Sequence, residues 1–171
     1  MKRERPSWDE FFMLDAIKTT TRSSCVYLQT GAVIVKDKRV IATGYNGAPP
    51  NIKNCLERGC RKDRERINFD DKGKGVCRGV HAEYNAMCQR SRDELKGTTI
   101  YSVYCPCSAC AKQIVGNGLS RVVFLNHYQE PDSLTTELFE EAKIELVHFN
   151  FNGRLNYFLE QMRKIACRKL R

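Results

Sequence analysis

The sequence predicts an α/β fold, a three-layer α/β/α sandwich around a mixed sheet of about five strands. The apolar pattern begins with a helix, continues with a β-hairpin, and then alternates short apolar strands with helical segments. Strand–helix–strand units place neighbouring strands in parallel, and their helices cover both faces of the sheet. A length of 171 residues fits one domain with an ordinary core, so residues 1–171 are expected to form a single domain.

The first helix is expected from about Trp8 to Arg22. Ser7 and Glu10 form a capping box ahead of an apolar pattern with helical spacing. A β-hairpin is expected over residues 32–42, where two apolar runs flank a short polar turn.

The second half of the chain continues the alternation and ends in a basic amphipathic segment, which we expect to be helical at about 154–171. The other expected strands cover residues 99–104, 121–125 and 145–149, and the other expected helices follow His81 and cover residues 107–115 and 133–143.

An insertion at about 51–79 interrupts this pattern with many charged residues and little apolar content. A loop this long inside a compact domain is functional or is held by something. Cys55, Cys60 and Cys77 lie in it, and Cys25 precedes the hairpin. Four thiolates could close a structural zinc site, although spacing alone leaves scattered free cysteines equally open. Cys88 and Cys167 are expected only to pack.

Two short motifs carry the chemistry: His81-Ala82-Glu83, and Pro106-Cys107 followed by Cys110. One imidazole and two thiolates suit zinc, and three ligands leave a fourth tetrahedral position for water, as in catalytic sites. An H-x-E sequence followed by P-C-x-x-C is the mark of zinc nucleobase deaminases. The alternative is that the cysteines are ordinary thiols and that the histidine lies on the surface. The presence of both motifs in one chain disfavours it.

The motif residues have separable expected roles. If each motif opens a helix, Cys107 and Cys110 lie on one face of a first turn. Zinc held by these cysteines and His81 would lower the pKa of its water toward about 7. Glu83 is then the expected catalytic acid/base, moving that proton to the nucleobase and its departing amine.

Composition limits the setting. The formal charge is +9, from 29 Lys+Arg against 20 Asp+Glu, and would attract nucleotide phosphates or nucleic acid, or simply maintain solubility. Much of the excess lies at the two ends, as in solvated tails. No signal peptide or membrane span is evident, so a cytoplasmic protein without a membrane partner is expected. In a reducing compartment the nine cysteines favour zinc over disulfides.

With these motifs in place, the chain resembles the cytidine deaminase-like superfamily, and most closely its deoxycytidylate (dCMP) deaminase family, which includes late-competence deaminase-like proteins. The zinc motifs define the superfamily, and the sequence Gly44-Tyr45-Asn46-Gly47 points to dCMP. The resemblance covers Trp8 to about Phe149, and its other carriers are Trp8–Met13, Arg22–Cys25 and Ala48-Pro49.

The resemblance implies hydrolysis of dCMP to dUMP and ammonia, which supplies dUMP for thymidylate synthesis. It implies that Asn46 hydrogen-bonds the 3′-hydroxyl of the sugar, although Asn-Gly alone would indicate a tight turn. It also implies a homo-oligomer, commonly a hexamer, and dCTP or dTTP as effectors in some relatives. It maps a structural zinc to Cys25, Cys55, Cys60 and Cys77. The expected substrate contacts are Asn46 and Ala82, with Arg22 and Tyr128 nominated for the phosphate.

Other functions stay open at this point. The substrate could be dCTP, or a cytosine or adenine in single-stranded nucleic acid or tRNA. Nucleic acid ranks second because core burial is expected to account for most of the aromatic side chains. A non-catalytic, zinc-stabilised protein of competence or DNA uptake is the third possibility, but a purely structural metal would not require Glu83.

Overall fold

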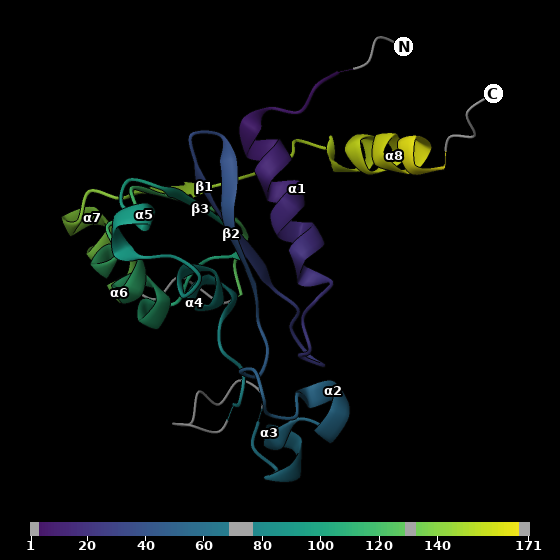
Figure 1. Cartoon of the computed structure of the whole chain (residues 1–171), viewed down its shortest axis with the longest axis vertical. Helices are drawn as coiled ribbons and strands as arrows, with labels where there is room; N and C mark the ends of the chain where they lie inside the picture. The colour runs from purple at the N-terminus through teal and green to yellow at the C-terminus, as the bar shows by residue number, and fades with distance from the viewer. Residues whose placement is uncertain (1–3, 69–76, 129–132, 168–171) are drawn as a thin grey trace.

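The computed structural model describes residues 4–68, 77–128 and 133–167. It contains, in chain order, α1 (Trp8–Thr20), β1 (Gly31–Lys36), β2 (Arg39–Tyr45), α2 (Cys55–Arg58), α3 (Arg61–Arg64), α4 (Ala82–Met87), α5 (Arg92–Leu95), β3 (Thr99–Tyr104), α6 (Ser108–Gly116), β4 (Arg121–Asn126), α7 (Ser133–Glu141), β5 (Glu145–His148) and α8 (Leu155–Ala166). The strands form one five-stranded sheet in the order β2-β1-β3-β4-β5 (Figure 1). The predicted mixed sheet within an α/β fold is confirmed.

The start of α1 follows the predicted capping box. Ser7 Oγ accepts a hydrogen bond from the Glu10 N–H at 3.2 Å, and Glu10 Oε2 accepts one from the Ser7 N–H at 2.6 Å. The helix ends at Thr20, two residues before the expected end. The start of α1 is therefore fixed by local side-chain hydrogen bonds that the sequence already indicates.

The predicted hairpin is also confirmed, and β2 is longer than expected. Asp37 and Lys38 have φ angles of 49° and 59°, and two left-handed residues match the twist of a tight two-residue hairpin turn. Because β2 extends to Tyr45, it reaches the end of the sheet away from the hairpin turn, where the Gly44–Gly47 stretch lies.

The other half of the sheet is parallel, as predicted: β3 pairs with β4, and β4 with β5. The chain leaves β3 toward the cysteine motif, and there the Cys105 N–H donates to the carbonyl of Asn126 at 2.9 Å. The cysteine motif therefore begins where the carboxyl ends of neighbouring parallel strands meet, the usual place for sites in such sheets.

Two apolar cores cover the two faces of the sheet. On one face α1 and the start of α8 pack against β1, β3 and β4, and the buried side chains are Phe12, Met13, Ala16, Val33, Val35, Tyr101, Val103, Val123, Phe151 and Phe158. On the other face, α4, α5, α6 and α7 contribute Ala82, Ala86, Met87, Leu95, Ala111, Ile114 and Phe139. This second layer carries both predicted zinc motifs.

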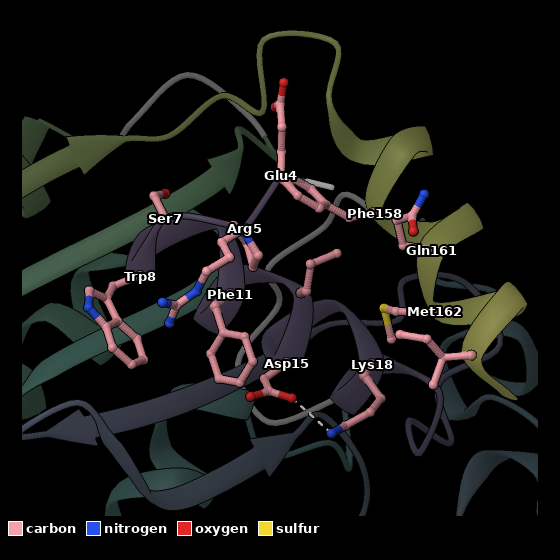
Figure 2. A pocket seen from close by; sticks show the side chains of 13 residues that line it. Glu4, Arg5, Ser7, Trp8, Phe11, Asp15, Lys18, Phe158, Gln161 and Met162 are labelled. Atoms are coloured by element: carbon pink, nitrogen blue, oxygen red, sulfur yellow. Dashed lines mark hydrogen bonds and ion pairs between the residues drawn. The ribbon is translucent and has the colours of Figure 1, made fainter. Parts of the chain in front are cut away.

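The C-terminal helix α8 forms as predicted and ends at Ala166; residues 168–171 of the predicted basic segment lie outside the described part. Phe158 is its buried side chain, and Arg154 just before it pairs with Glu10 at 3.1 Å. Between α1 and α8 an apolar groove of about 770 Å³ remains, and Phe11 and Met162 face it (Figure 2).

The insertion contains short helices that the sequence analysis did not predict. In Figure 1, α2 and α3 lie beyond one edge of the main body. The ends of the insertion meet in an antiparallel bridge between Gly47 and Val80. Residues 69–76, which include part of the predicted charged stretch, lie outside the described residues. Among the helices described, none is both long enough and apolar enough to cross a bilayer.

Candidate active site

The first zinc motif opens α4, as predicted. His81 is the N-cap residue with an extended backbone, and Glu83 lies in the first turn. This helix lies directly on β2 at Gly44, where a Cβ would come within 2.1 Å of the Ala82 carbonyl oxygen and 2.4 Å of the Ala86 nitrogen. Gly44 is therefore required for the close approach that brings His81 and Glu83 to the sheet.

The second motif opens α6 in the same manner. Cys107 is the N-cap residue, and its carbonyl accepts a hydrogen bond from the Ala111 N–H at 2.8 Å. Cys110, in the first turn, is buried. Thr135 of α7 donates to the Pro106 carbonyl at 3.4 Å, so a third helix holds the segment that enters α6.

The three predicted ligands come together. His81 Nδ1 lies 3.5 Å from Cys107 Sγ and 3.4 Å from Cys110 Sγ. Zn–S bonds of about 2.3 Å and Zn–N bonds of about 2.0–2.1 Å place tetrahedral N and S ligands about 3.5 Å apart, so the donor set fits zinc. In the described part of the chain, this is the group of three whose ligand atoms all lie within 4.8 Å of one another.

The electrostatics favour a ligand-ready thiolate. Hydrogen bonding from the Cys110 thiol, and also from His81, holds the pKa of Cys107 far below its usual range, although burial opposes this. The pKa of His81 is raised, chiefly by its hydrogen bond to Cys107. By contrast, burial raises the pKa of Cys105 to about 11. Cys105 therefore stays a neutral thiol beside the site and is not in the ligand group.

Glu83 lies beside the ligands without joining them. Its side chain is buried, with 5% of the residue exposed, and burial raises its pKa. Ser102 Oγ donates to Oε1 at 3.3 Å, and Oε2 lies 3.7 Å from Cys110 Sγ. A carboxyl group in this position, with a raised pKa, is suited to carry a proton.

The pocket beside the metal ligands has a volume of about 330 Å³. Its lining is Gly79, Val80, His81, Tyr84, Ala109, Cys110 and Gln113. Sequence reasoning missed Tyr84 and Gln113 as lining residues. Gln113 lies three residues after Cys110, on the same face of α6, so helical spacing could have identified it.

Asn46 precedes Gly47, which bridges to the pocket residue Val80, but its side chain bonds the loop between α1 and β1. Its Oδ1 accepts hydrogen bonds from Ser23 Oγ at 2.6 Å and the Thr30 N–H at 2.9 Å, and its Nδ2 donates to the Leu28 carbonyl at 2.7 Å. The second Nδ2 hydrogen is not used by any of these bonds. The contact of Asn46 with the sugar stays a prediction. Its observed hydrogen bonds give Asn46 a structural role as well.

The other nominated substrate contacts are more dispersed. Ala82 is buried at the start of α4. Arg22 is exposed, and its guanidinium carbon lies 5.9 Å from the centre of the Tyr45 ring. Tyr128 packs edge-on against Tyr104 at the carboxyl ends of β3 and β4, with ring centroids 6.4 Å apart. None of the three lines the pocket as the described residues form it, so their roles also stay predictions.

The four cysteines predicted to bind a structural zinc lie in one neighbourhood. Burial raises the pKa of Cys55, and the thiols of Cys60, Cys25 and Cys77 raise it further. The Leu28 N–H donates to Cys25 Sγ at 3.5 Å, and the Gly79 N–H donates to Cys77 Sγ at 3.3 Å. Within the described ranges their sulfur atoms do not form a group at ligand distance, and the second zinc stays a prediction.

One expectation about burial is wrong. Cys88 and Cys167 are exposed, because they lie at the C-terminal ends of α4 and α8, where no core covers them. Core burial does account for most of the aromatic side chains in the described residues, as expected. The exposed ones are Trp8, Phe11, Tyr27, Tyr45, Tyr84 and Tyr128.

A three-layer α/β/α sandwich with a His-Cys-Cys site and a buried glutamate defines the class of zinc-dependent deaminases. Residues 6–126 match the family described as the cytidine and deoxycytidylate deaminase zinc-binding region, and the chain belongs to this family. The expected family is thereby confirmed.

Two relatives and one solved structure illustrate the similarity. The deoxycytidylate deaminase of Saccharomyces cerevisiae is 38% identical over 86% of this chain, which spans about half (46%) of that protein. The deoxycytidylate deaminase of Mycobacterium phage D29 is 41% identical over 70% of this chain and 95% of its own length. The crystal structure of dCMP deaminase from cyanophage S-TIM5, in complex with dCMP and dUMP, is 25% identical, with a TM-score of 0.68 over 86% of this chain and 100% of that chain.

Proposed function

We propose that the chain catalyses the zinc-dependent hydrolytic deamination of dCMP to dUMP and ammonia, and so supplies dUMP for thymidylate synthesis. The observation that carries the proposal is the buried carboxyl group of Glu83 beside, but not within, the group of His81, Cys107 and Cys110. A purely structural metal would not require this carboxyl group. The relatives and the solved structure that are named for dCMP support the choice of nucleotide.

His81, Cys107 and Cys110 would hold the zinc, which when bound supplies a water of lowered pKa at the open fourth position. Glu83 takes a proton from the attacking water and delivers it to N3 of the cytosine ring as the oxygen adds to C4. A second proton transfer through Glu83 to the C4 amino group lets ammonia leave while the carbonyl of uracil forms. The raised pKa of Glu83 supports this role, because the carboxyl group must both accept and release a proton near neutrality.

Nucleotide selection is proposed to use side chains around the pocket. Tyr84 is 44% exposed and lines the pocket with Gln113, so both can contact the base. The second Nδ2 hydrogen of Asn46 is the proposed donor to the sugar. Arg22 and Tyr128 are the proposed phosphate contacts, and Arg22 supplies the positive charge that a monophosphate needs.

We propose a second, structural zinc bound by Cys25, Cys55, Cys60 and Cys77. Support comes from the effect of the other three cysteines on the pKa of Cys55, which requires them to lie near it. Backbone N–H groups also donate hydrogen bonds to Cys25 and Cys77. Such donors stabilise thiolates. Few apolar side chains are available to hold the insertion, and a metal would take the place of a core there.

Assembly and regulation are also proposals. The resemblance favours a homo-oligomer, commonly a hexamer, with dCTP or dTTP as effectors, and the apolar side chains exposed along α1 and α8 are compatible with association. Sedimentation velocity gives the mass of the assembly, and dCMP kinetics with each triphosphate tests the effectors.

Substrate choice is tested by measuring ammonia release from dCMP, dCTP, deoxycytidine, a cytosine oligonucleotide and an adenosine-containing tRNA stem-loop. We expect dCMP to give the highest kcat/KM and the Glu83→Gln variant to be inactive with every substrate. Faster turnover of the oligonucleotide or the stem-loop than of dCMP would show that the substrate is nucleic acid and not a free nucleotide. Zinc-loaded protein that is inactive with all five substrates would favour the non-catalytic alternative.

A further inference from the structure

The two carboxylate oxygens of Glu83 lie in different surroundings. Oε1 accepts a hydrogen bond from Ser102 Oγ at 3.3 Å, whereas Oε2 lies 3.7 Å from Cys110 Sγ. One oxygen is thus attached to strand β3, and the other faces the metal ligands. The side chain therefore has a defined rotation about its last bond.

Ser102 is a polar residue at a position that packing alone would give to an apolar one. It is fully buried, with 0% of its surface exposed, and its partners across the sheet are Ala32 and Phe124. Ile100, two residues earlier on the same face of the strand, belongs to the apolar core. A hydroxyl group buried among such neighbours is costly unless it is bonded, and Glu83 supplies that bond.

We propose that Ser102 is the positioning residue for Glu83: by donating to Oε1 it fixes the rotation of the carboxyl group and keeps Oε2 directed at the metal ligands and the reacting base. This inference rests on the proposed function. The last torsion of a glutamate side chain is broad, so without an anchor the carboxyl group would sample unproductive rotations. Proton transfer requires the donor and acceptor atoms within hydrogen-bond reach.

The test compares Ser102→Ala with Ser102→Thr, which keeps a hydroxyl group. The matched control is Thr98→Val, because Thr98 is also buried but donates to the Leu95 carbonyl instead. We expect Ser102→Ala to keep its zinc and its KM for dCMP, while kcat falls about ten- to a hundredfold. Ser102→Thr should recover most of kcat, and Thr98→Val should leave it unchanged.

An unchanged kcat in Ser102→Ala would overturn the proposal, as would an equal loss in Thr98→Val. If Ser102→Thr melts at a lower temperature because of its added methyl group, binding measurements decide the question. The probe is a dCMP analogue with a tetrahedral, hydroxyl-bearing C4, compared with dUMP. Ser102→Ala should lower the affinity for the analogue by about the same factor as it lowers kcat, and should leave the affinity for dUMP unchanged.

In a Glu83→Gln background, Ser102→Ala should lower the affinity for the analogue by a different factor than it does in the wild-type background, because the two residues act as a pair. Fully additive effects contradict the proposal. A failure of the proposed function is distinguishable, because wild-type protein would then not deaminate dCMP at all. In that case crystal structures of wild type and Ser102→Ala still test the positioning, and an identical Glu83 carboxyl orientation in both would refute it.

Discussion

Glu83 illustrates how a single residue acquires its role from its surroundings. The carboxyl group lies in the first turn of α4, is buried against β3 and next to Cys110, and has a raised pKa because of that burial. His81, two residues earlier, joins the ligand group while Glu83 does not. The proposed metal ligand and the proposed proton carrier therefore lie within one helical turn.

Replacing Glu83 with alanine should abolish catalysis and leave the metal in place. We expect deamination of dCMP to fall by at least about 10²–10⁴-fold, the usual contribution of a positioned acid/base. Zinc content and melting temperature are measured on the same preparations. Loss of the catalytic zinc from Glu83→Ala, together with full activity in Glu83→Gln, would show that Glu83 does not carry the proton.

Asn46 presents a different case, because its side chain supports the loop that precedes β1. Removing it in Asn46→Ala leaves the Thr30 N–H without its acceptor and the Leu28 carbonyl without its donor, while the Ser23 hydroxyl keeps only the backbone carbonyl of residue 46. We expect a loss of about 1–3 kcal/mol in the free energy of unfolding, and a fall of about ten- to a hundredfold in kcat/KM for dCMP. Urea unfolding and steady-state kinetics separate the two effects. If stability falls while the kinetics of the folded fraction are unchanged, Asn46 is structural only.

At the scale of elements, the site depends on how closely α4 approaches the sheet. Gly44 on β2 leaves room for the backbone of α4, and the Asn85 side chain donates from α4 to the Tyr45 carbonyl at 2.7 Å. On the opposite face of the sheet an ion pair connects α1 to the sheet: Arg121 of β4 donates two hydrogen bonds, of 2.8 and 3.0 Å, to Asp9 of α1. Each helix layer thus has its own connection to the sheet.

Gly44→Ala should displace α4 and with it the first zinc motif. The added methyl group would meet backbone atoms, which cannot move aside as a flexible side chain can, so we expect a destabilisation of about 1–3 kcal/mol or more. Zinc content should fall in parallel. Gly116→Ala is the matched control, because its Cβ would meet nothing within 4 Å, and it should be neutral or slightly stabilising. Equal unfolding curves for the two variants would refute the explanation.

The Asp9–Arg121 pair should make the free energy of unfolding decrease at acidic pH. Hydrogen bonding from Arg121 lowers the pKa of Asp9, so the folded protein binds fewer protons than the unfolded chain once the pH approaches the ordinary Asp value of about 3.9. The contribution is complete above that pH and is lost as pH falls through the folded pKa.

We therefore expect Arg121→Met to cost about 1–2 kcal/mol at pH 7 and 5, with a smaller difference from wild type at pH 3. Urea unfolding at the three pH values measures this. Arg163→Met removes an exposed pair with Glu160 and is the control. A difference between wild type and Arg121→Met that does not change with pH would contradict the assignment.

At the scale of the whole molecule, one sheet supports two layers with different tasks. The layer of α4 and α6 carries the proposed metal ligands, while α1 and the start of α8 complete the core on the other face of the sheet. The insertion extends from the end of β2 and returns to the site through the Gly47–Val80 bridge. Val80 and the adjacent Gly79 also line the pocket, so the shape of the insertion affects the entrance to the site.

A structural metal in the insertion should therefore be detectable separately from the catalytic one. We expect two zinc ions per chain, and one in Cys55→Ser, by metal analysis of protein purified without chelator. Cys167→Ser, which removes an exposed thiol outside both sets, should keep two. Because zinc binding is coupled to folding, Cys55→Ser should also melt at a lower temperature. One zinc in the wild-type protein would rule out the second site.

The sequence by itself determined the candidate metal site and much of the framework. His81, Glu83, Cys107 and Cys110 were identifiable because ligand type and i, i+3 spacing are local properties, and the capping box at Ser7 and the hairpin turn at Asp37 are local for the same reason. The parallel strands followed from their alternation with helices. These features depend on neighbours within a few residues, which the sequence displays directly.

Only the tertiary structure decided which distant residues support the site. Ser102 meets Glu83 across 19 positions of the chain, and Asn46 binds Ser23 across 23. The close approach at Gly44 and the exposure of Tyr84 likewise depend on how one layer lies on another. A pattern along the chain does not encode these distances, because each contact is set by the packing of complete elements against the sheet.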